Sequence, residues 1–457
     1  MEELLDAADA LMAANPETPP RPDFSIPEAL CTELLMDCKE GKKGRGWFAR
    51  QPIAAGTVLM VDKPLAMVMD WQESIQVADY DNFNEENADE YEEQEGGSML
   101  NDLLLFELLK GIQQDPSLWT DKLSNLYPRD NETAASLPVW ICQDDSLFCA
   151  IEAKIQELSN LFADAKDITK RLPLVVRYNV LSIETCPELL IHPGPAGHAV
   201  LSGAGLYFLP SYFNHDSRPN ASRWAVGDLM WFVANQDIAS GDEICISYLE
   251  HDVLCESPAR RTLMLDMDFT EGEQIEEEDD GPQFPVVDNE VQNELMMINP
   301  LERLGAIKEL MDQATGEAPP AEEIQEGEDA MEVNQTRWFQ CDAHNLRIIE
   351  AITLDSLGRS IEALKAWEEC VVFTETLLPP NDESSVVMRV QAALCARRAG
   401  NATTANAHAV VAVQTHNVIF GGGISRFRRR YQRELMMNLR PGSDVMADAD
   451  ALWPIIS

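Results

Sequence analysis

Hydrophobic positions follow two different patterns along the chain. In residues 31–70 and 196–250, short apolar or alternating runs are bounded by Gly, Pro and Asp, which predicts β-strands. In residues 98–180 and 335–440, apolar residues recur at helical spacing. The patterns predict an α+β protein: a β-rich part interrupted by a helical insert, followed by an all-helical part.

The helical parts show individual helices in the sequence. Apolar residues at helical spacing predict helices over 99–114 and 146–165. Farther along, Gly358 and Gly400 each follow an apolar helix and precede an Ala-rich one. This repeated helix–Gly–helix layout resembles tetratricopeptide repeats in a longer, degenerate form. A plain helical bundle fits the same pattern equally well.

Changes in composition set the expected boundaries between these parts. Acidic, Gly- and Pro-containing stretches separate the periodic segments and indicate loops or linkers. We expect the following divisions: an N-terminal lead over 1–30, a β-rich domain over 31–270 interrupted by an acidic loop at 72–97 and a helical insert at 98–180, an acidic linker with one helix over 271–334, a helical domain over 335–440, and a tail over 441–457.

The net charge of −45 limits the range of partners. Much of it lies in three runs, 85–95, 271–280 and 317–332, which we interpret as solvated loops that keep the protein soluble. The alternative is that they attract a basic protein segment. In either case the charge argues against nucleic acid as a direct ligand, because phosphates would be repelled.

Neither a membrane segment nor a secretory signal is predicted. No apolar run is long enough to cross a bilayer, and the first residues are acidic and amphipathic. The ten cysteines include no CxxC pair, the usual spacing of zinc ligands, and a disulfide framework is not expected in a large chain without a signal. We therefore expect a monomer with reduced thiols and no metal, in the cytoplasm, the nucleus or both.

Three polar segments carry the chemistry. Residues 214–220 read NHDSRPN, and Ser247 and Tyr248 follow Pro219 by 28 and 29 residues within GDEICISYLE. Upstream, residues 42–49 read KKGRGWFA. These segments resemble the two signature motifs of SET-domain lysine methyltransferases, roughly NHSCxPN and GEExxxxY, and the Gly-x-Gly loop that opens that fold. Each is weak alone, whereas three in the right order make a strong signal.

The wider layout resembles that of the SET-and-MYND methyltransferases. The resemblance covers residues 38–75 and 177–270 well, and residues 335–430 more loosely. Two departures concern zinc. No Cys lies between 39 and 141, where that family has a Cys/His-rich MYND finger, and none lies in 259–273, where it has a Cys-rich site. The chain is a pared-down relative, and the family's zinc-dependent properties do not transfer to it.

The resemblance implies S-adenosylmethionine as cofactor and roles for individual residues. Tyr248 would be the catalytic residue, and Tyr207 and Phe213 would line the channel for the substrate lysine, although packing in the core explains Phe213 equally well. Asp216 and Ser217 replace the family's usual Ser and Cys. The cofactor-binding residues implied are Lys43, Gly44, Arg45, Gly46, Asn179, Asn214, His215 and Phe269.

These residue types suit transfer of a methyl group to an amine. A tyrosine hydroxyl can accept CH···O contacts from a polarised methyl group and orient the amine. An Arg or Lys on a glycine loop can meet a carboxylate. The expected substrate is a basic, lysine-containing segment of a histone or another protein. The alternative is a SET-derived binding scaffold without catalysis, which the missing zinc sites favour and the intact Asn-His…Tyr set opposes.

Overall fold

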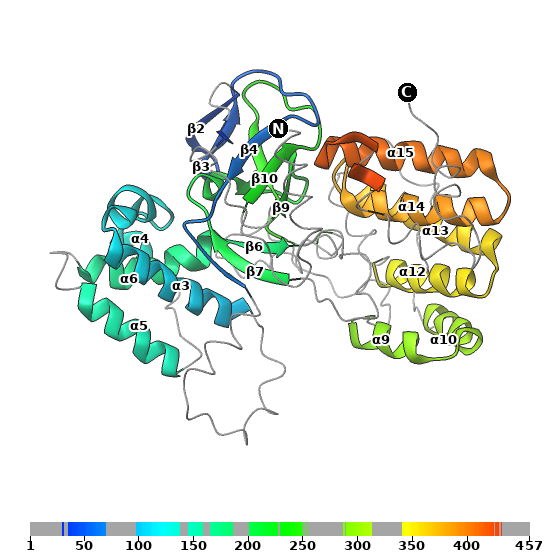
Figure 1. Ribbon diagram of the computed structural model, residues 1–457, viewed down its shortest axis with the longest axis horizontal. Coiled ribbons are helices and arrows are strands. Elements are labelled where there is room, and N and C mark those ends of the chain that lie inside the picture. The colour runs from blue at the N-terminus through cyan, green and yellow to red at the C-terminus, as the bar shows by residue number, and fades with distance from the viewer. Residues whose placement is uncertain are drawn as a thin grey trace.

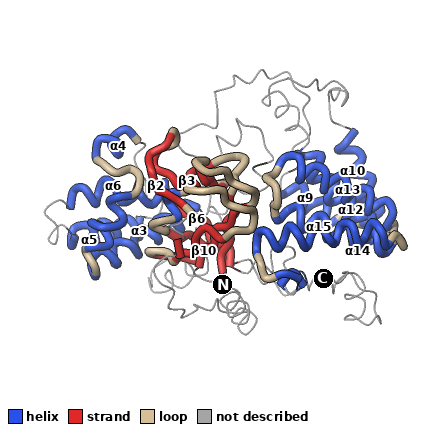
Figure 2. Tube along the Cα trace, turned by 90° about the horizontal axis from the view of Figure 1, so that it is seen from above, coloured by secondary structure: helices blue, strands red, loops and turns tan. Residues whose placement is uncertain are grey.

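The computed structural model describes most of the two patterned parts of the chain. The described residues are 30–31, 35–69, 97–137, 145–158, 165–185, 201–226, 229–249, 254, 287, 289–312, 341–424, 426–428 and 431. Strands occupy the middle of the molecule, with one group of helices on each side (Figures 1 and 2). The α+β organisation expected from the sequence is present.

The β-rich part forms three small sheets. Their strand orders are β1-β4-β10-β9, β2-β3-β11-β8 and β5-β7-β6. Only β8 and β11 pair in parallel among the described strand pairs. The strands are β1 (Leu30–Cys31), β2 (Met36–Gly41), β3 (Gly44–Ala49), β4 (Val58–Asp62), β5 (Ala66–Met69), β6 (Val180–Thr185), β7 (Leu201–Leu206), β8 (Asn214–His215), β9 (Ala221–Val226), β10 (Leu229–Ala234) and β11 (Glu243–Ile246).

The continuous apolar runs become the central strands. β10 is buried along its whole length and pairs with β4 on one side and β9 on the other. Strand β6 was not expected, because the sequence pattern placed the next strands only from residue 196. It follows a helix without a Gly or Pro between them, and its antiparallel pairing with β7 stabilises it as a strand. Tertiary pairing here overrides a weak local signal.

The helical insert packs against these sheets. The helix expected over 99–114 is α3 (Gly97–Gln114), whose leucines Leu104 and Leu108 are fully buried in the same core as the strands. The helix expected over 146–165 corresponds to α5 (Asp145–Leu158). Helices α4 (Asn131–Ser136) and α6 (Ala165–Asn179) complete the insert. Residues 72–96 of the expected acidic loop lie outside the described residues.

The C-terminal helical region consists of helices that pack in sequence order (Figure 1). Gly358 and Gly400 have positive φ angles of 74° and 79° where one helix ends and the next begins, as expected of glycines that terminate helices. Described helices of this region are α9 (Asn289–Met297), α10 (Pro300–Asp312), α12 (Cys341–Ser356), α13 (Ser360–Leu377), α14 (Glu383–Arg398) and α15 (Ala402–Phe420).

One expectation for the linker 271–334 was wrong. The sequence predicted a single helix there, whereas the structure has two, α9 and α10. Asn299 separates them: its side chain accepts a hydrogen bond of 3.0 Å from the Leu301 amide and so starts the second helix ahead of Pro300. The first helix is short and mostly polar. It is held by burying residues such as Leu295 against α10 and α12.

The helical region contacts the β-rich part at several places, and two of them involve α15 and α13. At the first, Trp224 of β9 stacks on Trp231 and donates a hydrogen bond of 3.1 Å to the carbonyl oxygen of Ile419 in α15. At the second, Phe373 and Leu377 of α13 pack around a cluster that begins directly after the second sheet. Its other members are Tyr248, Leu249, Leu254 and Leu378. The second contact brings α13 next to the Tyr248 segment.

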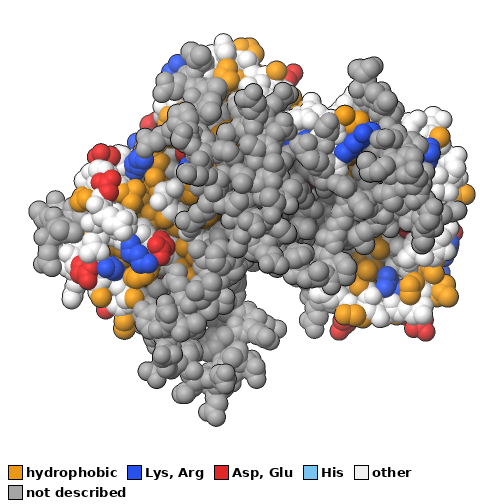
Figure 3. Space-filling model, viewed as in Figure 1, with side chains coloured by type: hydrophobic (Ala, Val, Ile, Leu, Met, Phe, Trp, Pro, Cys, Tyr) orange, Lys and Arg blue, Asp and Glu red, His pale blue; other side chains and the backbone are white. Residues whose placement is uncertain are grey.

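The surface carries some exposed apolar side chains. On the face shown in Figure 3, hydrophobic side chains gather over α9 and α10, where Met297 and Leu301 are 90% and 69% exposed. None of the helices in the described residues is long and apolar enough to cross a membrane.

Candidate active site

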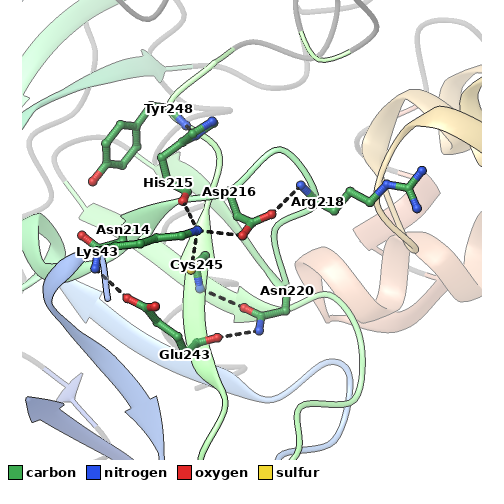
Figure 4. A network of polar contacts seen from close by, with 9 residues as sticks. All are labelled: Lys43, Asn214, His215, Asp216, Arg218, Asn220, Glu243, Cys245 and Tyr248. Atoms are coloured by element: carbon green, nitrogen blue, oxygen red, sulfur yellow. Dashed lines mark hydrogen bonds and ion pairs between the residues drawn. The ribbon is translucent and has the colours of Figure 1, made fainter. Parts of the chain in front are cut away.

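A tight hairpin between β2 and β3 brings Lys43 to the end of strand β8. β2 and β3 pair up to Gly41 and Gly44, which leaves Lys42 and Lys43 as a two-residue turn. Gly44 has a φ of 96°, which favours glycine. From this turn the Lys43 Nζ donates hydrogen bonds of 2.7 Å to the His215 carbonyl oxygen and to Oδ2 of Asp216 (Figure 4).

The Asn-His pair is held by the parallel pairing of β8 with β11. Asn214 lies opposite Cys245, and His215 opposite Ile246. The Asn214 side-chain amide donates to Oε1 of Glu243 at 2.6 Å and to the Arg45 carbonyl oxygen at 3.3 Å. Main-chain pairing therefore fixes both residues, and hydrogen bonds to Glu243 and to the Arg45 carbonyl oxygen fix the Asn214 side chain.

Gly46 allows this close approach. A Cβ atom at position 46 would lie 2.5 Å from Glu243 Oε1 and 2.6 Å from Asn214 Nδ2. Any other residue would push apart the two side chains that meet there. Gly46, which the sequence motif placed in the opening loop, is therefore required here because a larger residue would not fit.

Tyr248 is fastened at both ends to the Asn-His segment. Its main-chain amide donates to His215 Nδ1 at 3.0 Å, and its hydroxyl donates to the Phe213 carbonyl oxygen at 2.8 Å. The first bond makes Nδ1 an acceptor, so the neutral imidazole carries its proton on Nε2. Burial raises the pKa of Tyr248 above its ordinary value, so the hydroxyl stays protonated at neutral pH.

Two further residues of this network were not assigned from the sequence. Asn220 donates to the Glu243 carbonyl oxygen at 2.8 Å and accepts from the Cys245 amide at 2.9 Å, and so ties the turn after β8 to β11. Glu243 holds Asn214. The available signals were the second Asn of NHDSRPN and the acid of GDE, but their roles depend on the pairing of distant strands.

Three charged side chains meet in the network: the ammonium group of Lys43 and the carboxylates of Asp216 and Glu243. Partial burial alone would lower the pKa of Lys43, but the hydrogen bond to Asp216 and the negative charges around it outweigh burial and raise that pKa. Lys43 is therefore a stable cation. Cys245 lies 4.0 Å from Lys43 Nζ, and burial raises the pKa of its thiol to about 12, so it stays neutral.

Two of the residues implied as cofactor ligands have other partners. The Arg45 guanidinium donates to the Tyr212 hydroxyl at 3.0 Å and lies 5.0 Å from the centre of that ring. Its carbonyl oxygen, rather than its side chain, contacts Asn214. Asn179, the last residue of α6, donates to the carbonyl oxygens of Tyr127 and Val175. These bonds anchor the helical insert, and a cofactor role for Asn179 stays a prediction.

The residues proposed for the lysine channel are buried in the core. Tyr207 and Phe213 are both fully buried, and Phe213 stacks on Phe232 with ring centres 4.6 Å apart. The Phe213 carbonyl oxygen nevertheless accepts the Tyr248 hydroxyl, so this residue belongs to the site through its main chain. Phe269 lies outside the described residues. Within those residues, no group of three or more His, Cys, Asp or Glu could hold a metal ion.

Comparison with known proteins identifies this region. The family model for the SET domain matches residues 44–249. These residues form a SET domain. The matched range includes Asn214, His215 and Tyr248, and it begins one residue after Lys43.

Individual proteins are similar to parts or most of this chain. A SET and MYND domain-containing protein of Dictyostelium discoideum is 28% identical over 145 residues, which cover 30% of this chain and 25% of the relative. The chain thus matches a quarter of that relative's length. Two solved structures of the SET domain of LSMT, bound to AdoHcy with lysine or methyllysine, are 12% and 13% identical. The matches cover 98% and 92% of this chain and 99% and 96% of those chains, with TM-scores of 0.27 and 0.25.

Proposed function

We propose that the protein is an S-adenosylmethionine-dependent protein-lysine N-methyltransferase. The observation that carries this proposal is the double attachment of Tyr248, whose amide and hydroxyl are both bonded to the Phe213–His215 segment. This attachment places the neutral Tyr248 hydroxyl beside the Asn-His pair of the SET domain. The two contacts fix the position of the hydroxyl relative to the Asn-His pair.

The side chains present fit the proposed cofactor. Lys43 is a cation that suits a carboxylate. The Asn214 side chain, whose N–H groups bond to Glu243 and to the Arg45 carbonyl, presents its oxygen as an acceptor. Gly46 keeps the backbone of β3 free of a side chain beside them. When bound, S-adenosylmethionine supplies a methyl group on a positively charged sulfonium. The SET-domain match supports this choice of cofactor.

Tyr248 has the bonding that the reaction needs from it. Its proton is donated to the Phe213 carbonyl oxygen, so the hydroxyl oxygen can act toward a polarised methyl group as an acceptor of weak CH···O contacts. Its raised pKa keeps the hydroxyl neutral, so it does not attract and hold a charged lysine. Methyl transfer requires a neutral amine in line with the methyl group, and in favourable cases such positioning supplies about 7–11 kcal/mol of the barrier.

The helical region supplies a second feature, a cavity of about 580 Å³ beside α13. It is lined by one face of that helix and by parts of α10 and α12: Met311, Ala343, His344, Arg347, Lys365, Glu368, Glu369, Val372, Phe373, Thr376 and Leu377. Phe373 and Leu377 also pack around the cluster that includes Tyr248. We propose that the substrate protein lies against this cavity while its lysine enters the SET domain, as a concave tetratricopeptide-like wall would allow.

Calorimetric titration with S-adenosylmethionine tests the cofactor assignment. The parent protein should bind it at one site. Asn214→Ala should lose most of that affinity with an unchanged unfolding midpoint, because the side chain is partly exposed and contacts only Glu243 and the Arg45 carbonyl. Unchanged affinity in this variant would exclude the site. Cofactor binding without any methyl transfer would instead support a scaffold that has lost catalysis.

A further inference from the structure

The ion pair between Lys43 and Asp216 involves a residue that departs from the resembled motif. The resembled SET motif has a small uncharged residue at the position of Asp216, and here a carboxylate stands there. The two side chains are 42% and 40% exposed, so solvent reaches both of them. An exposed ion pair contributes little to stability, which leaves its presence at this position to be explained by something other than folding.

We propose that Lys43 and Asp216 together bind the amino-acid part of the cofactor, Lys43 through its carboxylate and Asp216 through its ammonium group. This inference rests on the proposed function. It assigns Asp216 as a binding residue and gives a role to the departure from the family motif. An amino acid is a zwitterion, and a neighbouring cation and anion form its complement.

The remaining bonding capacity of the pair fits this role. Lys43 has three N–H donors, and two of them serve the His215 carbonyl oxygen and Asp216. Asp216 accepts from Lys43 with Oδ2 and from the Arg218 amide at 2.9 Å with Oδ1, and a carboxylate has about four acceptor positions. The third N–H donor makes a long contact of 4.0 Å with the weak acceptor Cys245 Sγ, which it can exchange for a carboxylate oxygen, and Asp216 has further acceptor positions on the adjacent atoms.

The charge of the network supports the same ligand. The Lys43–Asp216 pair is neutral, as is the amino-acid part of the cofactor. Lys43, Asp216 and Glu243 together then carry one net negative charge; Arg218 meets Asp216 through its main-chain amide, and its guanidinium points away from the pair (Figure 4). The cationic sulfonium would complement that charge, whereas demethylated AdoHcy lacks it. With an uncharged residue at position 216 this negative charge would be absent, so Asp216 should favour the cofactor over the product.

The alternative role for Asp216 predicts the opposite effect. If Asp216 competed with the cofactor carboxylate for Lys43, removing its charge would free Lys43 and tighten binding. The direction of the change in affinity therefore separates the two roles. Asp216→Asn is the suitable variant, because it keeps the shape and an oxygen that can accept from the Arg218 amide.

The test compares two ligands by calorimetry. S-adenosylmethionine carries the amino-acid part, and 5′-methylthioadenosine keeps the nucleoside and sulfur without it. Asp216→Asn should bind S-adenosylmethionine about tenfold more weakly, the loss of one charged hydrogen bond, and bind 5′-methylthioadenosine within about twofold of the parent. The control is Asp37→Asn, which removes the carboxylate of an equally exposed ion pair with Arg50 on the same hairpin. It should change neither affinity.

Decarboxylated S-adenosylmethionine retains the ammonium group and lacks the carboxylate, so its affinity shows which residue binds which of the two groups. Its affinity should fall in Asp216→Asn and stay unchanged in Lys43→Gln. Equal losses for all ligands in Asp216→Asn would show a structural role and overturn the inference, as would unchanged or tighter binding of S-adenosylmethionine. A parent protein that binds neither S-adenosylmethionine nor 5′-methylthioadenosine would instead overturn the proposed function.

Discussion

The SET-domain network and the cavity beside α13 are built in different ways. In the network, Asn220 and Tyr248 are each bonded to main-chain atoms of distant segments, and Asn214 is held between β3 and β11. In the cavity, side chains meet other side chains: Arg347 pairs with Glu369, and Val372 is 66% exposed. Main-chain contacts hold atoms in place, as chemistry requires, whereas side-chain linings can change with the partner. We therefore expect turnover to depend on the first region and substrate affinity on the second.

The largest expected effect lies in the network. Tyr248→Phe removes the hydroxyl bonded to Phe213 and should lower turnover about 100-fold or more, because such contacts act mainly in the transition state. Affinity for S-adenosylmethionine should stay within about twofold, since the His215 contact uses the main-chain amide. Steady-state rates together with calorimetry measure the two quantities. If this variant methylates as well as the parent, Tyr248 is only a core residue.

A substitution in the cavity should change KM for the protein substrate rather than kcat. Val372→Glu places a charge on the exposed cavity lining and should raise KM for the protein substrate about tenfold, with little change in kcat or in affinity for the cofactor. The matched control is Ile361→Glu, because Ile361 is on the same helix, is 73% exposed and does not line the cavity. Equal effects of the two substitutions would show that α13 does not contact substrate.

The net charge of the protein should have a smaller effect, on the rate with basic peptides. A lysine peptide flanked by Arg or Lys should react several-fold faster than a neutral one at low salt, because the protein carries a net charge of −45. That advantage should fade above about 0.15 M salt, where the Debye length is about 8 Å. Rates on both peptides across a salt series measure this. A preference that does not depend on salt would leave the charge as a solubility device.

The smallest expected effect concerns His344 in the cavity. Its ring stacks on Phe373 with centres 4.0 Å apart, and burial lowers its pKa from 6.5 to about 4. The unfolded chain therefore binds a proton more readily than the folded protein between these pH values, so folding stability falls as pH drops from 6.5 toward 4. On going from pH 7 to pH 5.5, the parent should lose about 1 kcal/mol more than His344→Phe in urea unfolding. Equal losses would mean that His344 does not titrate differently on folding.

The sequence was most informative where a local pattern determines the outcome. Apolar patterns were enough to predict α3 and the strands β4 and β5, and turn glycines marked the ends of α12 and α14. The motifs also identified residues that the fold brings together: Lys43, Asn214, His215 and Tyr248 form one connected network.

The sequence was least informative where the outcome depends on distant contacts. The roles of Asn220 and Glu243 arise from the parallel pairing of β8 with β11, which no local pattern encodes. Strand β6 exists because β7 pairs with it. The side chain of Arg45 turns to Tyr212, although its position in the opening loop fitted a carboxylate ligand. In each case a partner far along the chain decides the conformation.

Transfer of labelled methyl groups tests the central claim most directly. The parent protein and Tyr248→Phe are incubated with methyl-labelled S-adenosylmethionine and a heat-inactivated cell lysate stripped of its own cofactor, and the protein fraction is hydrolysed and separated into amino acids. The account predicts label in methylated lysine with the parent and almost none with Tyr248→Phe. Label in another amino acid, or equal labelling by the two proteins, would contradict it.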